Sequence, residues 1–80
     1  MHVPLLMPDL DLSPPQGIAV SCWLVALGRE VVEGDRLLEL SAGDVLVDLP
    51  APATGKLTQK SVAEGEAVAA NQVLGVIETQ

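Results

Sequence analysis

The side chains that could act as nucleophiles, bases or metal ligands are few and scattered along this chain. His2 is the only histidine, and Cys22, the only cysteine, lies among apolar residues, as expected for a packed thiol. The acids Asp9, Asp11 and Asp48 do not form a spaced set of metal ligands. No histidine, acid and nucleophile converge, so the sequence predicts neither a catalytic nor a metal site, and the chain is not expected to be an enzyme.

One stretch, 39–52, is organised around a tight turn and is the best candidate for a functional site. Apolar and polar residues alternate before and after the turn, although Leu46 breaks the alternation. The centre of the stretch is Ala42, Gly43 and Asp44, in which glycine supplies a positive φ and aspartate tolerates turn geometry. Strands of period two around a short Gly-Asp turn predict a β-hairpin with these three residues at its tip.

The rest of the chain also predicts short strands separated by turns. Strands are expected at 3–7, 18–26, 36–41, 45–49, 56–62 and 73–77. A surface loop is expected at 9–16, because its Pro-Pro step fits neither a helix nor a central strand. Turns are expected at 31–35 and 64–66, and no segment demands a helix.

One pattern of glycine, valine and leucine occurs twice, with a constant separation of 37 residues. The first copy, Gly28-x-x-Val31-x-x-Gly34-Asp35-x-Leu37-x-x-Leu40, returns as Gly65-x-x-Val68-x-x-Asn71-Gln72-x-Leu74-x-x-Ile77. Agreement at several positions without a gap is specific for an internal repeat. The repeat predicts an all-β fold, a flattened barrel or sandwich of two four-stranded antiparallel sheets with pseudo-twofold symmetry. Residues 1–80 form one domain, and the termini are expected together, opposite the hairpin.

Composition and charge restrict the partners. The chain has 4 basic and 11 acidic side chains and a formal net charge of −7, which disfavours nucleic acid and anionic membranes. Trp23 is the only aromatic residue and is expected to cap an aliphatic core. The opening residues of the chain are not expected to act as a signal peptide, and no run of residues is expected to span a membrane. A single cysteine favours a reducing compartment, so a cytoplasmic, monomeric domain is expected.

These motifs resemble the lipoyl/biotinyl carrier-domain family over nearly the whole chain. The resemblance is carried by Met7-Pro8, Gly17, Trp23-Leu24-x-x-x-Gly28-x-x-Val31-x-x-Gly34-Asp35-x-Leu37-x-Glu39, Pro50-Ala-Pro52-x-x-Gly55-x-Leu57 and Glu64-Gly65-x-x-Val68-x-x-Asn71-Gln72-x-Leu74-x-x-Ile77-Glu78. The Met-Pro start and the Trp-Leu pair are more similar to lipoyl domains of 2-oxoacid dehydrogenase acyltransferases than to biotin carriers. One extra residue before the Trp-Leu pair departs from the family pattern.

In that family, the lipoyl or biotinyl group is attached to a lysine at the hairpin tip. The resemblance places this position on Asp44, and residues 41–43 depart from the family motif as well. Lys56 and Lys60 lie beyond the Pro-Ala-Pro stop and are not expected at a hairpin tip. The resemblance therefore implies the carrier fold without an acceptor for its lipoyl cofactor, so no cofactor is expected on this domain.

Three functions follow from this resemblance and from the charge. The first is a structural or docking module of an acyltransferase-type protein, with protein partners such as other components of a 2-oxoacid dehydrogenase complex. The second is a working lipoyl carrier whose swinging arm moves acyl groups between active sites, against which Asp44 argues. The third is a stand-alone acidic module that binds a basic partner. An Ala/Pro-rich linker and further domains after Gln80 would separate the first from the third.

Overall fold

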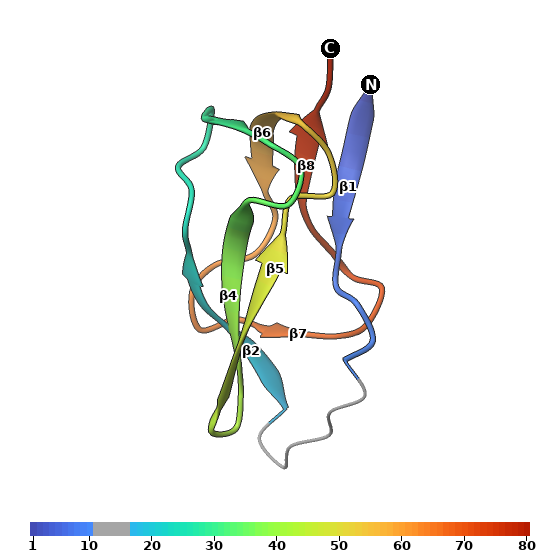
Figure 1. Cartoon of the computed structure of the whole chain (residues 1–80). Coiled ribbons are helices and arrows are strands. Elements are labelled where there is room, and N and C mark those ends of the chain that lie inside the picture. Colours follow the sequence, from blue (N-terminus) through green and yellow to red (C-terminus); the bar gives the residue numbers. More distant parts are fainter. Residues whose placement is uncertain (11–16) are drawn as a thin grey trace.

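The computed structural model describes residues 1–10 and 17–80, which form only β-strands and their connections (Figure 1). The strands are β1 (His2–Leu6), β2 (Ile18–Trp23), β3 (Glu30–Val31), β4 (Arg36–Ala42), β5 (Val45–Pro50), β6 (Gly55–Lys60), β7 (Ala67–Val68) and β8 (Val73–Glu78). The described residues include no helix with the length and hydropathy needed to cross a bilayer. Six residues of the predicted loop, 11–16, lie outside the described residues.

The strands form two four-stranded sheets in which every pairing is antiparallel, which confirms the predicted fold class. One sheet has the order β1-β8-β6-β3 and the other the order β5-β4-β2-β7. The molecule measures 40 × 19 × 19 Å along its principal axes. The two termini lie side by side at one end, and the β4–β5 hairpin projects from the other (Figure 1). At the terminal end, the Thr79 N–H donates to the Met1 carbonyl at 2.9 Å.

The sequence prediction is wrong for the two short strands, β3 and β7. It assigns Val31 to a turn and gives Val68 no element, but both residues lie in strands, β3 and β7, of two residues each. A strand of two residues cannot display an alternation of apolar and polar side chains, so no periodicity reveals it. The predicted strand 18–26 is also too long, because β2 ends at Trp23 and a turn follows.

The space between the sheets is filled by aliphatic side chains from both of them. Every buried side chain in the described part of the chain is apolar. Removing one leucine side chain from water contributes about 2 kcal/mol to folding, which makes this set the main stabilising term. The largest fully buried side chains are those of Met7, Leu37, Leu38, Leu40, Leu57, Leu74 and Ile77.

The predicted pseudo-twofold symmetry is visible in the backbone hydrogen bonds that connect the two halves. The Gly28 N–H donates to the Leu57 carbonyl at 2.7 Å, and the Gly65 N–H donates to the Val20 carbonyl at 2.8 Å. The two donors lie 37 positions apart, and so do the two acceptors, with the order of the halves reversed. Each half therefore holds the other by the same bond.

The β-bulges repeat with the same separation. In β2 the register shifts around Ser21, and in β6 it shifts around Thr58. The Ser21 hydroxyl donates to Oε1 of Glu39 at 3.0 Å, and the Thr58 hydroxyl donates to the Val76 carbonyl at 3.4 Å. A bulge adds twist to a strand, so two equivalent bulges bend both sheets in the same way.

The turns that follow β3 and β7 are also equivalent. Gly34 has φ +95°, and Asn71, which occupies the same place in the second half, has φ +69°. The next side chain closes each turn: Oδ2 of Asp35 accepts from the Val32 N–H, and Oε1 of Gln72 accepts from the Ala69 N–H. Asparagine tolerates the left-handed conformation better than most residues, so the turn survives without glycine there.

Trp23 breaks the symmetry, because it reaches from the end of β2 onto the opposite sheet. Its Nε1–H donates to the Val62 carbonyl at 2.9 Å, and the ring packs against the core. A Cβ atom at Gly75 would lie 3.1 Å from the ring and 2.7 Å from the Gln59 carbonyl oxygen. Because Gly75 has no side chain, the Trp23 ring can pack directly on β8. The expected core-capping role of Trp23 is confirmed.

Replacing Gly75 with alanine should destabilise the domain by about 2 to 3 kcal/mol, because the new methyl group overpacks the seam between ring and strand. Gly28→Ala is the matched control: its φ of +88° is unfavourable for alanine, but nothing lies within 4 Å of the new Cβ. The control should cost about 1 kcal/mol. Urea unfolding followed by circular dichroism measures both, and equal losses would contradict the close-approach argument.

Candidate functional site

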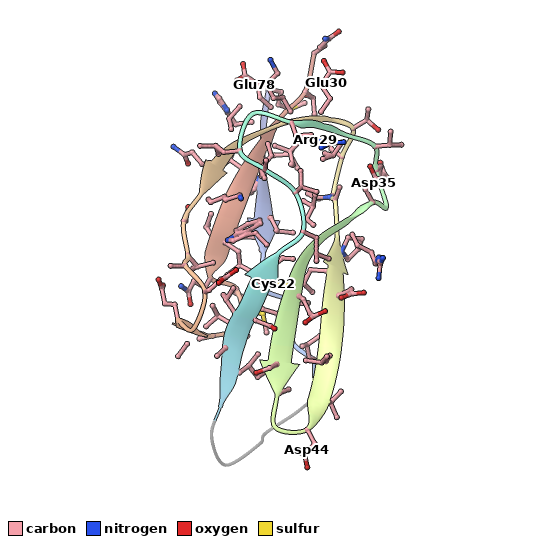
Figure 2. The ribbon with its side chains drawn as sticks, turned by 90° about the vertical axis from the view of Figure 1, so that its left-hand side faces the viewer. Cys22, Arg29, Glu30, Asp35, Asp44 and Glu78 are labelled. Atoms are coloured by element: carbon pink, nitrogen blue, oxygen red, sulfur yellow. The ribbon has the colours of Figure 1, made fainter. Side chains whose placement is uncertain are left out.

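The tip of the β4–β5 hairpin is a two-residue turn of Gly43 and Asp44. Ala42 pairs with Val45 across the end of the ladder, so only two residues remain in the connection. Gly43 has φ +64°, which matches the glycine-first requirement of a type II′ turn. Figure 2 shows Asp44 at the extreme end of the molecule, with its side chain directed into solvent.

Ala42 does not belong to the tip, contrary to the sequence prediction. It is the last residue of β4 and is only 5% exposed, whereas the two turn residues are exposed. Its side chain lies on the inward-facing side of β4, where Leu38 and Leu40 are also buried. The prediction failed because a small apolar residue next to glycine resembles turn composition as much as strand composition.

The outer face of the hairpin near its tip is acidic and carries an exposed leucine, Leu46. In the ladder, Glu39 lies opposite Asp48 and Ser41 lies opposite Leu46. The Arg36 guanidinium contacts Oδ2 of Asp48 at 3.1 Å, but the arginine side chain is 73% exposed. An ion pair so open to solvent contributes at most about 1 kcal/mol, so it holds the two side chains loosely.

The two lysines of the chain lie away from this tip, as expected. Lys56 pairs with Glu30 and Glu78 in its sheet. Figure 2 labels those two acids at the end of the molecule opposite Asp44. Lys60 ends β6, and its Nζ lies 5.3 Å from the centroid of the Trp23 ring, a cation–π distance.

The other residues considered for chemistry are also placed apart. His2 is exposed on β1, and Cys22 is a half-buried free thiol on β2, consistent with the packed cysteine expected there. Asp48 belongs to the hairpin, Asp9 lies after β1, and Asp11 falls outside the described residues. No group of three or more potential metal ligands occurs among residues 1–10 and 17–80.

An open hollow at the terminal end is a feature that the sequence does not reveal. Three segments distant in sequence line it, and the lining includes no histidine or cysteine. Its polar lining side chains include two glutamates, two threonines and one lysine. Its lining residues are Glu30, Val31, Val32, Thr54, Gly55, Lys56, Glu78, Thr79 and Gln80.

The molecule is thus a sandwich of two sheets that presents a tight turn at one end, away from the termini. Comparison with protein families agrees: the family described as "Biotin-requiring enzyme" matches residues 5–79. The chain therefore belongs to the lipoyl/biotinyl carrier-domain family, as its motifs predict. This is a family of carrier domains, which present a cofactor to the enzymes that act on it.

Individual relatives come from acyltransferases. The dihydrolipoyllysine-residue succinyltransferase component of the 2-oxoglutarate dehydrogenase complex of Bartonella vinsonii subsp. berkhoffii is 37% identical over 98% of this chain and 19% of its own length. The component of the same name from Haemophilus influenzae is 34% identical over 99% of this chain and 19% of its own length. A third relative is the lipoamide acyltransferase component of the branched-chain alpha-keto acid dehydrogenase complex of Bacillus subtilis. It is 32% identical over 95% of this chain and 18% of its own length. The chain spans about a fifth of these curated relatives.

The two tip residues should differ sharply in their effect on stability. Gly43→Ala places a side chain at φ +64° and should cost about 1 kcal/mol. Asp44→Ala changes an exposed carboxylate and should shift the free energy of unfolding by less than about 0.5 kcal/mol. Urea unfolding of both variants measures the difference. A large loss in Asp44→Ala would mean that this carboxylate supports the turn.

Proposed function

We propose that this domain is a carrier fold without a carried group, and that it acts as a structural or docking module of an acyltransferase-type protein. The observation that supports the proposal is the residue at the hairpin tip. The family resemblance aligns Asp44 with the acceptor lysine, and Asp44 is the second residue of the two-residue turn. The position is therefore presented as a carrier domain would present it, but with a different functional group.

The chemistry of attachment explains why this exchange matters. A lipoyl group is held by an amide bond, which forms when the lysine amine attacks the activated lipoyl carboxyl and the leaving group departs. The Asp44 carboxylate has no N–H to give up and cannot form that amide. It also reverses the charge that a modifying ligase meets at the tip.

The other amines of the chain are poor substitutes. Lys56 lies near the terminal end, opposite the hairpin, and the Met1 ammonium lies there as well, 3.2 Å from the Thr79 carbonyl oxygen. Lys60 lies over the Trp23 ring. None of these groups stands on a two-residue turn, so none is presented to a ligase in the way that the hairpin tip is.

The partner class follows from the relatives. Their names place them in 2-oxoglutarate and branched-chain alpha-keto acid dehydrogenase complexes. We therefore propose that the partners of this domain are proteins of such a complex. A working swinging arm is the weaker alternative for this chain because it requires the amine that Asp44 lacks.

Intact mass after coexpression with a lipoate ligase, in the presence of lipoate, tests the proposal. The native domain should keep its unmodified mass. Asp44→Lys and the double variant Gly43→Asp/Asp44→Lys should each gain the mass of one lipoyl group, the double variant more completely. Ala42 is kept in both variants because its side chain is buried and threonine there would overpack the core.

Two outcomes would overturn the proposal. A native domain that gains one lipoyl group would show an acceptor elsewhere, and Lys56→Arg and Lys60→Arg would then locate it. Folded lysine variants that stay unmodified beside an authentic lipoyl domain would mean that the fold is not a ligase substrate, so that the loss of the lysine alone does not define its function. Circular dichroism confirms that each variant is folded.

A further inference from the structure

The two sheets have four edge strands, and they are not protected equally. β3 and β7 contain two residues each, too few to pair with another chain over any length. β1 carries Pro4 in its middle, and proline has no N–H to offer a neighbouring strand. β5 has six residues, and its only proline is Pro50, the last of them. Among the described strands, β5 is therefore the edge left open.

The hairpin register shows which backbone groups this edge presents. In a two-residue hairpin, the residues that flank the turn, here Ala42 and Val45, form a hydrogen-bonded pair. Bonded and non-bonded pairs then alternate, and the register is unbroken from this pair to Glu39 and Asp48. Leu46 and Asp48 thus direct their N–H and C=O groups away from β4, towards the side on which no strand of the described residues pairs with β5.

The side chains at this edge have a definite character. Leu46 is 63% exposed and is the most exposed leucine of the described residues. Asp44 and Asp48 lie two residues to either side of it, and Asp44 is exposed at the turn. Asp44, Leu46 and Asp48 stand two residues apart, so a chain paired with this edge would face them with every second side chain. An extended segment with a basic, an apolar and a basic residue at positions i, i+2 and i+4 fits this arrangement.

We propose that β5 is a docking edge for an extended basic segment of a partner protein, which adds to the sheet as a fifth strand beside Leu46 and Asp48. The inference rests on the proposed docking function and specifies its surface and partner chemistry. The backbone of the segment bonds to the free groups of β5. Its lysine or arginine side chains face Asp44 and Asp48, and an apolar side chain covers Leu46.

A second copy of this chain is a poorer occupant of the same edge. An antiparallel pairing of two β5 strands centred on Leu46 would bring Asp44 of each copy opposite Asp48 of the other. Like charges placed directly opposite across strands are destabilising. The net charge of −7 on each copy adds a general repulsion. Charge complementarity therefore favours a basic partner.

Amide hydrogen exchange followed by NMR tests the proposal. The probe is the peptide Thr-Lys-Thr-Val-Thr-Lys-Thr, which presents lysine, valine and lysine in this order on one face of an extended strand. At saturating peptide, exchange at the Leu46 and Asp48 amides should slow by about tenfold or more, because both become hydrogen-bonded. The same peptide with glutamate for lysine should not bind. A version N-methylated at alternate residues keeps its charge but cannot complete the ladder, and it should bind weakly without protecting these amides.

Two matched variants separate the edge from the overall charge. Leu46→Lys places a cation against the basic peptide and removes the apolar contact, and it should weaken binding about tenfold. Leu27→Lys makes the same change at a leucine that is 60% exposed in a turn outside the hairpin, and binding should be unchanged. Because both leucines are exposed, neither change disturbs the core, and the amide spectrum verifies folding.

Three results would overturn the inference. They are the absence of binding by the basic peptide, binding without protection of the two β5 amides, and protection of these amides in a dimer without peptide, detected by sedimentation. None of them bears on whether the domain accepts a lipoyl group. Failure of the docking edge is thus distinguishable from failure of the proposed function, which intact mass decides.

Discussion

The fold depends on the exchange of two short strands between its halves. β3, from the first half, pairs with β6 of the second, and β7, from the second half, pairs with β2 of the first. Equivalent bonds from Gly28 and Gly65 fix each exchange. Neither half can complete its sheet alone, so the core forms only when distant parts of the chain meet. We expect a single cooperative unfolding transition for this reason.

This interlocking separates the demands of folding from those of function. The glycine, valine and leucine positions that maintain the exchange lie within the body of the sandwich, and they keep the same pattern in both halves. The hairpin projects beyond the exchanged strands, so its tip residues contribute little to the closure of the core. A domain built in this way can change the chemistry of Asp44 and its neighbours while the carrier fold stays intact.

The amino-acid sequence was sufficient to predict the pseudo-twofold symmetry, but not every strand. Equal spacing of Gly28 with Gly65, and of Gly34 with Asn71, marks equivalent turns and thereby predicts two equivalent sheets. β3 and β7 escaped prediction because their partners are remote and two residues carry no periodicity. Ala42 was misplaced because its burial depends on how far the ladder continues. The open edge of β5 depends on the strand order, which local patterns do not encode.

The pseudo-twofold axis makes the hairpin the counterpart of the chain ends. β4 and β5 in one sheet correspond to β8 and β1 in the other, with the Gly43–Asp44 turn where the second pair has its free termini. A short linker from Gln80 to Met1, combined with new chain ends in that turn, would give a circular permutant. The permutant would keep both sheets, but the two halves of the chain would follow each other in the reverse order. Such a permutation is feasible because the two chain ends already lie side by side, and no strand would have to move to accommodate the linker.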